Sequence, residues 1–257
     1  MGSRSKPLFR VAKQDTSATL CSLLMELSPE TIDHIRWGSL QLILLIISVG
    51  LHEFGHAWVA DLRGDPLPRA QGRVTLNPLA HADMIGTILI PAVMVFLSPG
   101  FGIIGWGKPV QISLMNPKTR RLDDILITLA GPAMNIVLCL AFVIIGVVGG
   151  LNPNINPSLS GGTPSATMVQ FLYMGIFLNV SLAIFNLIPL PPLDGSRIFL
   201  RLGIYTEEVF ESLARWSFLI LIILINLPFF REFMVSAMKI VVLPFLLVWE
   251  LFWPIFA

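Results

Sequence analysis

The sequence predicts an all-α polytopic membrane protein with about five to six membrane segments. Hydrophobic residues make up 54% of its 257 residues, and charged residues make up only 13%. The charged share is about half of that in ordinary globular domains, so a soluble fold would lack polar surface to cover itself. The apolar residues are also grouped in runs of about 20, which is the length that crosses a bilayer as a helix.

The chain divides into three parts by composition. Residues 1–39 are polar to mixed and predict an amino-terminal arm or an interfacial helix, in which Ser28 as N-cap and Pro29 as first residue would begin a helix. Residues 40–200 form the membrane core that carries the polar motifs. Residues 201–257 predict carboxy-terminal membrane helices. The expected apolar runs are 40–60, 84–106, 123–149, 167–190, about 212–229 and about 235–255.

The run 84–106 differs from the others because Pro91, Pro99 and Gly100-Phe101-Gly102 interrupt it. These residues favour a bent or re-entrant segment over a simple crossing. The polar stretch before it has turn signals, and residues 73–76 could form one strand of a small hairpin-like loop.

A metal-binding motif lies inside the first apolar run. His52-Glu53-Phe54-Gly55-His56 has two histidines four positions apart, so both imidazoles lie on one helical face and can reach one ion. Glu53, offset by one position, can hold a water molecule and take its proton. Two packed, hydrogen-bonded histidines are the alternative, but three polar residues within one membrane helix are costly without a function.

A catalytic zinc ion needs a third protein ligand and one open position. The chain has only four histidines, so the third ligand is His34, His81 or a carboxylate. Asp194 is the best carboxylate because Pro191-Pro192-Leu193-Asp194-Gly195 breaks a helix at membrane depth, which is tolerated where it lines a cavity. We expect one Zn²⁺ per chain.

Three segments in order resemble the site-2 protease family of intramembrane zinc metalloproteases. They are the residues 52–56, Ala130-Gly131-Pro132-Ala133-Met134-Asn135, and Asn186-Leu187-Ile188-Pro189 leading to Leu193-Asp194-Gly195. The resemblance implies that His52, His56 and Asp194 bind zinc and that Glu53 is the catalytic base.

The resemblance also implies that Asn186 lies near the scissile carbonyl, where its amide could stabilise an oxyanion. Asn135 would have a catalytic role or a role in helix packing. The sequence shows no PDZ-like insertion and no cystathionine-synthase-type domain, and in this respect it resembles the compact subgroup of the family. His81 and Asp83 lie in a segment that also resembles this subgroup, and they either approach the active site or form a polar turn with local hydrogen bonds.

Depth and charge predict the topology. Histidines and Asp194 reach one depth only if their two helices run parallel, so the run 84–106 should not cross the membrane once. Residues 61–83 and 107–121 would then lie on one side with seven of the basic residues, whereas loop 150–166 has no Lys or Arg. The positive-inside rule places the charged side, and the zinc near it, toward the cytoplasm of a bacterial-type cell membrane.

The sequence therefore predicts a zinc metalloendopeptidase that cuts transmembrane or membrane-proximal segments of substrate proteins, as in regulated intramembrane proteolysis. A non-enzymatic membrane protein that binds or transports metal is the alternative. A second rival is a different zinc peptidase whose third ligand is Glu207, Glu208 or Glu211. The expected partners are a membrane protein or membrane-bound peptide and the lipid bilayer, and an oligomer is compatible with the sequence. The net charge of +1 argues against nucleic acid.

Overall fold

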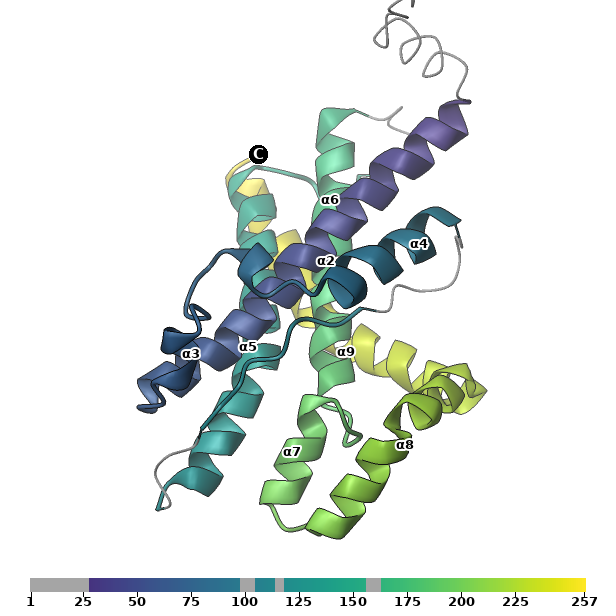
Figure 1. Ribbon diagram of the computed structural model, residues 1–257. Coiled ribbons are helices and arrows are strands. Elements are labelled where there is room, and N and C mark those ends of the chain that lie inside the picture. Colours follow the sequence, from purple (N-terminus) through teal and green to yellow (C-terminus); the bar gives the residue numbers. More distant parts are fainter. Residues whose placement is uncertain (1–27, 98–104, 114–117, 156–162) are drawn as a thin grey trace, which may run out of the picture.

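The computed structural model describes residues 28–97, 105–113, 118–155 and 163–257, and most of these residues are helical (Figure 1). Within these ranges the backbone forms no strand, only one isolated bridge. The all-α class predicted from the sequence is therefore confirmed. The α-helices are α2 (Pro29–Leu62), α3 (Leu67–Ala70), α4 (Ile90–Leu97), α5 (Arg120–Val148), α6 (Pro164–Asn186), α7 (Asp194–Arg201), α8 (Glu207–Asn226) and α9 (Pro228–Phe252).

Helix α2 begins where the sequence predicted. The hydroxyl of Ser28 accepts a hydrogen bond from the backbone N–H of Thr31 at 3.2 Å, and Pro29 occupies the first helical position. The helix then continues without a break to Leu62, so residues 29–39 are not a separate interfacial helix. The rest of the predicted amino-terminal arm, residues 1–27, lies outside the described residues.

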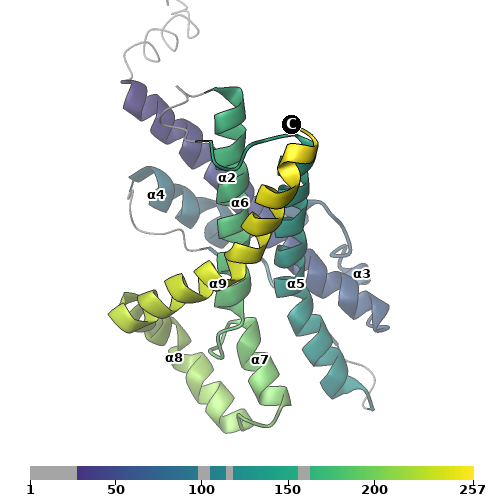
Figure 2. The same cartoon turned by 180° about the vertical axis from the view of Figure 1, so that it is seen from behind.

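Three long helices form the centre of the molecule. In Figure 1, α2 and α6 run in broadly the same direction and α5 runs in the opposite direction, as the depth of the histidines and Asp194 required. Helix α9 crosses the back of α5 and α6 (Figure 2). Their shared core is apolar. It includes the buried side chains of Leu44, Cys139, Val143, Leu172, Ile176 and Trp249.

The segment 84–106 starts and ends at the same place. Residues 84–89 form a π-helix that continues into α4, and the chain then returns so that Ala82 and Gly107 make an antiparallel bridge. The backbone N–H of Lys108 donates to the carbonyl of His81 at 2.8 Å. Ser113 is hydrogen-bonded through its N–H to Asp65 at 2.5 Å, close to the end of α2. A helix that crossed the membrane once would separate these two ends, so the geometry agrees with the re-entrant prediction, which membrane labelling can test; Pro99 and residues 100–102 lie outside the described residues.

The predicted strand at residues 73–76 is wrong. These residues form bends, and Pro78 then begins a short 3₁₀ helix that Asn77 caps. Arg73 turns inward and donates to the carbonyl of Ala80 at 2.6 Å, which holds the loop as a compact turn. The only β-bridge found in the described part of this region joins Ala82 to Gly107.

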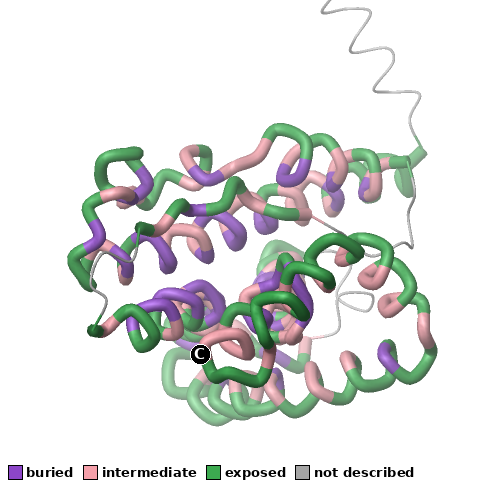
Figure 3. The backbone as a smooth tube through the Cα atoms, turned by 60° about the horizontal axis from the view of Figure 1, so that its bottom comes forward, coloured by how far each residue is buried: buried purple, intermediate pink, exposed green. Residues whose placement is uncertain are grey.

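The carboxy-terminal region is a helical hairpin. Pro228 cannot continue α8 but suits the first turn of α9, so α9 begins at 228 and not at about 235. Helix α8, which the structure describes throughout, has no buried residue (Figure 3). Among the described residues, four helices are long and apolar enough to cross a membrane, namely α2, α5, α6 and α9 with its last turn. The chain is an integral membrane protein.

Ion pairs gather at one end of this helical core. Arg63, after α2, donates to Asp123 in the first turn of α5 at 2.6 Å. Arg201, the last residue of α7, pairs with Asp124, whose side chain is almost fully buried. These contacts fix the ends of three helices relative to one another, next to the place where the polar motifs meet.

Candidate metal centre

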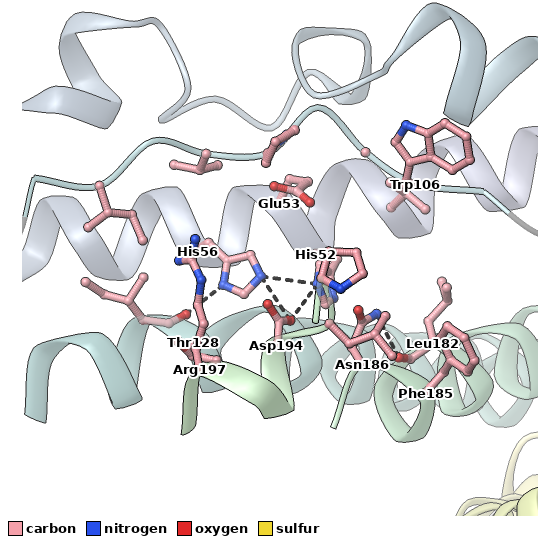
Figure 4. A pocket seen from close by; sticks show the side chains of 18 of the residues that line it. His52, Glu53, His56, Trp106, Thr128, Leu182, Phe185, Asn186, Asp194 and Arg197 are labelled. Carbon is pink, nitrogen blue, oxygen red and sulfur yellow. Dashed lines mark hydrogen bonds and ion pairs between the residues drawn. The ribbon is translucent and has the colours of Figure 1, made fainter. Parts of the chain in front are cut away.

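The two histidines of the HExxH motif lie side by side on the inner face of α2. Both are buried, with relative exposures of 6% for His52 and 8% for His56. Their Nε2 atoms lie 3.2 Å apart, as expected for residues one helical turn apart on one face. The motif therefore presents two imidazole nitrogens to the same point in space (Figure 4).

Each imidazole is held by an acceptor behind it. His52 Nδ1 lies 2.7 Å from Asn135 Oδ1, and His56 Nδ1 lies 2.7 Å from the carbonyl oxygen of Ile127. Because both oxygens only accept, both Nδ1 atoms must donate. The lone pairs of both rings are consequently at Nε2, which is the tautomer that binds a metal.

Asn135 is itself fixed by a buried polar network. Its Nδ2 donates to Asn179 Oδ1 on α6 at 2.9 Å, and Asn179 donates to Ser48 Oγ on α2 at 3.0 Å. Both asparagines are fully buried. Asn135 lies behind His52 and orients its ring. This position differs from both roles expected for Asn135, which were contact with substrate and simple helix packing.

Gly131 allows α5 to lie directly against the imidazoles. A Cβ at this position would lie 2.3 Å from His56 Nε2 and 2.7 Å from His52 Cε1. Such distances are far below van der Waals contact, so any larger residue would displace the rings. The glycine of the Gly131-Pro132 pair thus has a steric function at the site.

A break between α6 and α7 brings in the carboxylate. Helix α6 ends at Asn186, a tight turn follows, and Asp194 is the first residue of α7. Ser196 Oγ donates to the carbonyl of Leu193 at 2.6 Å, and Tyr205 donates to the carbonyl of Pro189 at 2.6 Å. Both ends of the turn are therefore braced, which fixes the direction of the Asp194 side chain.

Asp194 completes a nearly equilateral triangle of donor atoms. Its Oδ2 lies 3.2 Å from His52 Nε2 and 3.3 Å from His56 Nε2. This Oδ2 is buried and makes no hydrogen bond to any described residue. Three lone-pair atoms that face one another repel unless a cation lies among them. Ligand bonds of about 2.0–2.1 Å in a tetrahedron give ligand separations of about 3.3 Å, so the donor set fits Zn²⁺.

The triangle borders a cavity of about 280 Å³. Glu53 and Asn186 both line it, on opposite sides of the imidazoles (Figure 4). Glu53 lies against the returning segment, since a Cβ on Gly107 would be 2.8 Å from its Cγ. Asn186 Nδ2 donates to the carbonyl of Leu182 in its own helix at 3.0 Å. A carboxylate and an amide thus share one space with the three donors.

Other candidate ligands are not brought to this point. His34 lies in the first turns of α2 and contacts Phe96 edge-on. His81 is buried in the loop, where its Nε2 lies 3.1 Å from the carbonyl of Thr75 and burial lowers its pKa. Asp83 caps the π-helix by accepting from the N–H of Gly86 at 2.6 Å. Both side chains thus make local hydrogen bonds, and neither belongs to the donor group.

The glutamates that would serve a rival peptidase also lie elsewhere. Glu207, Glu208 and Glu211 are exposed at the start of α8. In the described part of the chain, His52, His56 and Asp194 are the one group of side chains that could together hold a metal ion.

Comparison with known proteins agrees with this geometry. The family model described as peptidase family M50 matches residues 40–153 and 155–225, which is most of the chain and includes all the donor residues. The chain belongs to peptidase family M50. This is the site-2 protease family that the sequence motifs resembled, so that prediction is confirmed.

Bacterial proteins named as zinc metalloproteases are among the M50 relatives. A Bacillus subtilis protein named "Putative zinc metalloprotease YwhC" is 40% identical over 61% of this chain and 65% of its own length, so slightly less than two thirds of that relative is covered. A Mycolicibacterium smegmatis protein named "Putative zinc metalloprotease Rip2" is 27% identical over 88% of this chain and 82% of its own length. No solved structure matches the chain significantly.

Several residues of this M50 site were not found by the sequence analysis. Asn179 and Ser48 support Asn135, Gly131 makes room for the imidazoles, and Thr128 lines the cavity. The only signal for any of them is the Gly131-Pro132 pair, which precedes Asn135 by a fixed spacing in the family motif. A single Asn or Ser in an apolar run belongs to no recognisable motif. The free-energy cost of placing a polar side chain inside a membrane is nevertheless a reason to expect a function for it.

Proposed function

We propose that the chain is a zinc metalloendopeptidase that hydrolyses peptide bonds in transmembrane or membrane-proximal segments of other membrane proteins. One observation carries the proposal. The donor triangle of His52, His56 and Asp194 shares its cavity with Glu53, and this cavity lies within the helical core of an integral membrane protein. A binding or transport site would have no need of an uncoordinated carboxylate beside the donors.

The residues divide the chemistry among them. His52, His56 and Asp194 would hold one Zn²⁺, with Asn135 and the Ile127 carbonyl fixing the two rings. When bound, zinc supplies a Lewis acid that polarises the carbonyl and lowers the pKa of water in its open position to about 7. Glu53 then accepts the proton of the attacking water and passes it to the leaving amide nitrogen.

Asn186 is placed to stabilise negative charge on the attacked carbonyl oxygen. Its Nδ2 carries two hydrogens, and only one of them is donated to Leu182. The second is free to donate into the cavity. A donor aimed at a developing oxyanion typically contributes about 10²–10³ in rate.

The substrate must open locally before it can be cut, because a helix hides its carbonyls in hydrogen bonds. Ile127, Thr128 and Arg197 line the cavity near the ion-paired end of the helical core, where basic residues of the loops also lie. By the positive-inside rule this end faces the cytoplasm, so water and the partly unwound segment would meet the zinc from that side.

The test compares wild-type protein with Glu53→Gln and Asp194→Ala after purification and reconstitution in vesicles. Glu53→Gln should retain zinc and lose at least about 100-fold in cleavage rate, whereas Asp194→Ala should lose zinc as well. Proteomics of membrane fragments that accumulate with wild type but not with Glu53→Gln would identify substrates. Retained proteolysis by Glu53→Gln would refute the assignment of the base. Zinc flux into vesicles that does not depend on Glu53 would instead support a transporter.

A further inference from the structure

A second, larger pocket opens next to the metal cavity. Its volume is about 750 Å³, and it lies between the returning segment 108–112, the start of α5, helix α7 and the start of α8. Four residues line both spaces, namely Pro109, Val110, Ile112 and Arg197. The two spaces are therefore adjacent, and a chain bound at the metal cavity can extend on this side toward the second pocket.

Basic side chains from three separate segments line this pocket. Lys108 comes from the returning segment, Arg120 from the start of α5, and Arg197 and Arg201 from α7. Arg201 is neutralised by Asp124. Lys108, Arg120 and Arg197 make no ion pair or side-chain hydrogen bond with any residue that the structure describes.

The acidic groups of the pocket do not balance this charge. Besides the paired Asp124, only Glu207 among the described acidic residues lines it, so four cationic groups face two carboxylates. The amino-terminal end of α5 adds partial positive charge beside Arg120, where a cationic side chain is disfavoured. Because like charges repel, this arrangement is stabilised when an anion enters the pocket.

We infer, on the basis of the proposed function, that this pocket binds acidic side chains of the substrate close to the bond that is cut. The substrate class is then membrane proteins with Asp or Glu beside the cleavable segment, on the flank that leaves the bilayer. Lys108, Arg120 and Arg197 are specificity-determining residues. A substrate with Lys or Arg on this flank is disfavoured by repulsion.

The geometry gives the distance from the scissile bond. Arg197 follows Asp194 by one helical turn, which places their Cβ atoms about 5–6 Å apart. Arg201 follows by seven residues, or about 10 Å along α7. An extended substrate advances about 3.3 Å per residue. The favoured acidic residues are therefore about two to three positions from the cut bond.

Binding to the inactive Glu53→Gln protein tests this inference separately from catalysis. Two fluorescent transmembrane peptides, with either three Asp or three Lys residues directly after the apolar span, are titrated in phosphatidylcholine nanodiscs. The Asp peptide should bind roughly tenfold tighter, the size expected for two or three partly exposed charge pairs. The difference in affinity between the two peptides should become smaller as salt is raised from about 0.05 to about 0.5 M, because salt screens exposed charge pairs.

Charge reversals identify the pocket. Lys108→Glu with Arg120→Glu should abolish or invert the preference, and Arg120→Gln alone should weaken it. Arg121→Glu is the matched control, because Arg121 is the next residue of the same helix end but does not line the pocket. Variants are compared at equal zinc content and equal elution volume, which shows that they are folded.

Equal affinity for the two peptides overturns the inference, as does an equal effect of Arg120→Glu and Arg121→Glu. A preference that appears only in nanodiscs with anionic lipid would mean that the pocket binds lipid headgroups and would also overturn it. If wild type cleaves neither peptide nor any membrane protein, the proposed function fails, whereas the binding preference is decided independently.

Discussion

Replacing Asn135 with leucine should weaken zinc binding without touching a metal ligand. Asn135 is fully buried, and its Oδ1 accepts the Nδ1–H of His52 at 2.7 Å. Leucine has a similar volume but offers no acceptor. The ring of His52 then loses the contact that fixes its rotation and keeps its proton at Nδ1.

The magnitude follows from the contact that is lost. A buried N–H left without an acceptor costs about 1–3 kcal/mol, and about 1.4 kcal/mol corresponds to a tenfold change in an equilibrium constant. Zinc affinity should therefore fall by about 10- to 100-fold, which agrees with the usual effect of removing a partner of a ligating histidine. Asn179 also loses its 2.9 Å hydrogen bond, so the metal-free fold should lose about 1 kcal/mol or more as well.

Two measurements separate these effects, namely zinc affinity from chelator competition and thermal stability of the metal-free protein. Asn135→Asp restores an acceptor for His52 but no donor for Asn179, so it should recover zinc affinity but not stability. Asn179→Leu is the converse control: it leaves Asn135 Oδ1 and the 3.4 Å contact of Asn135 Nδ2 with the Ser48 carbonyl in place, so it should lower stability more than zinc affinity. Wild-type zinc affinity in Asn135→Leu would refute the orienting role of this residue.

Three further outcomes are expected. Gly131→Ala should abolish zinc binding because its methyl carbon would lie 2.3 Å from an imidazole nitrogen, whereas Gly146→Ala, a crowded site elsewhere on α5, should lower stability but keep zinc; equal zinc loss would refute this. Burial lowers the pKa of His81 below its ordinary 6.5 in the folded loop. The locally unfolded loop therefore binds a proton at His81 more readily than the folded loop does. The loop should therefore be stable above about pH 6.5 and lose stability below it. This loss should be measured as weaker protection from hydrogen exchange in residues 73–83, and the pH dependence should be absent in His81→Asn. Protection that stays unchanged down to about pH 5.5 would contradict this. Single cysteines at positions 70 and 118 should be labelled from one side of the membrane, and opposite sides would exclude the re-entrant segment.

The metal centre was largely predictable because its chemistry leaves a pattern in the sequence. Helical spacing alone places His52 and His56 on one face, and the cost of charge in a membrane explains why Glu53 should have a function. The parallel course of α2 and α6 followed from depth and parity. Asp194, in contrast, was one of several open choices until the order of the three family motifs was considered.

The rest depends on how helices cross, which single-residue patterns do not encode. Gly131 and Asn135 meet the imidazoles only because α5 packs against α2 at one particular height, and Asn179 joins them from α6. The strand expected at residues 73–76 failed because Arg73 hydrogen-bonds within its own loop. The start of α9 was misplaced although Pro228, the residue that sets it, was visible in the sequence.

The donor triangle joins a helix made early in synthesis to a turn made late. His52 and His56 belong to α2, whereas Asp194 follows α5 and α6 in the chain and is synthesised after them. A chain whose synthesis has not reached Asp194 therefore has only two of the three metal-ligand residues. The complete donor set can therefore form only when α2, α5, α6 and α7 have packed against one another.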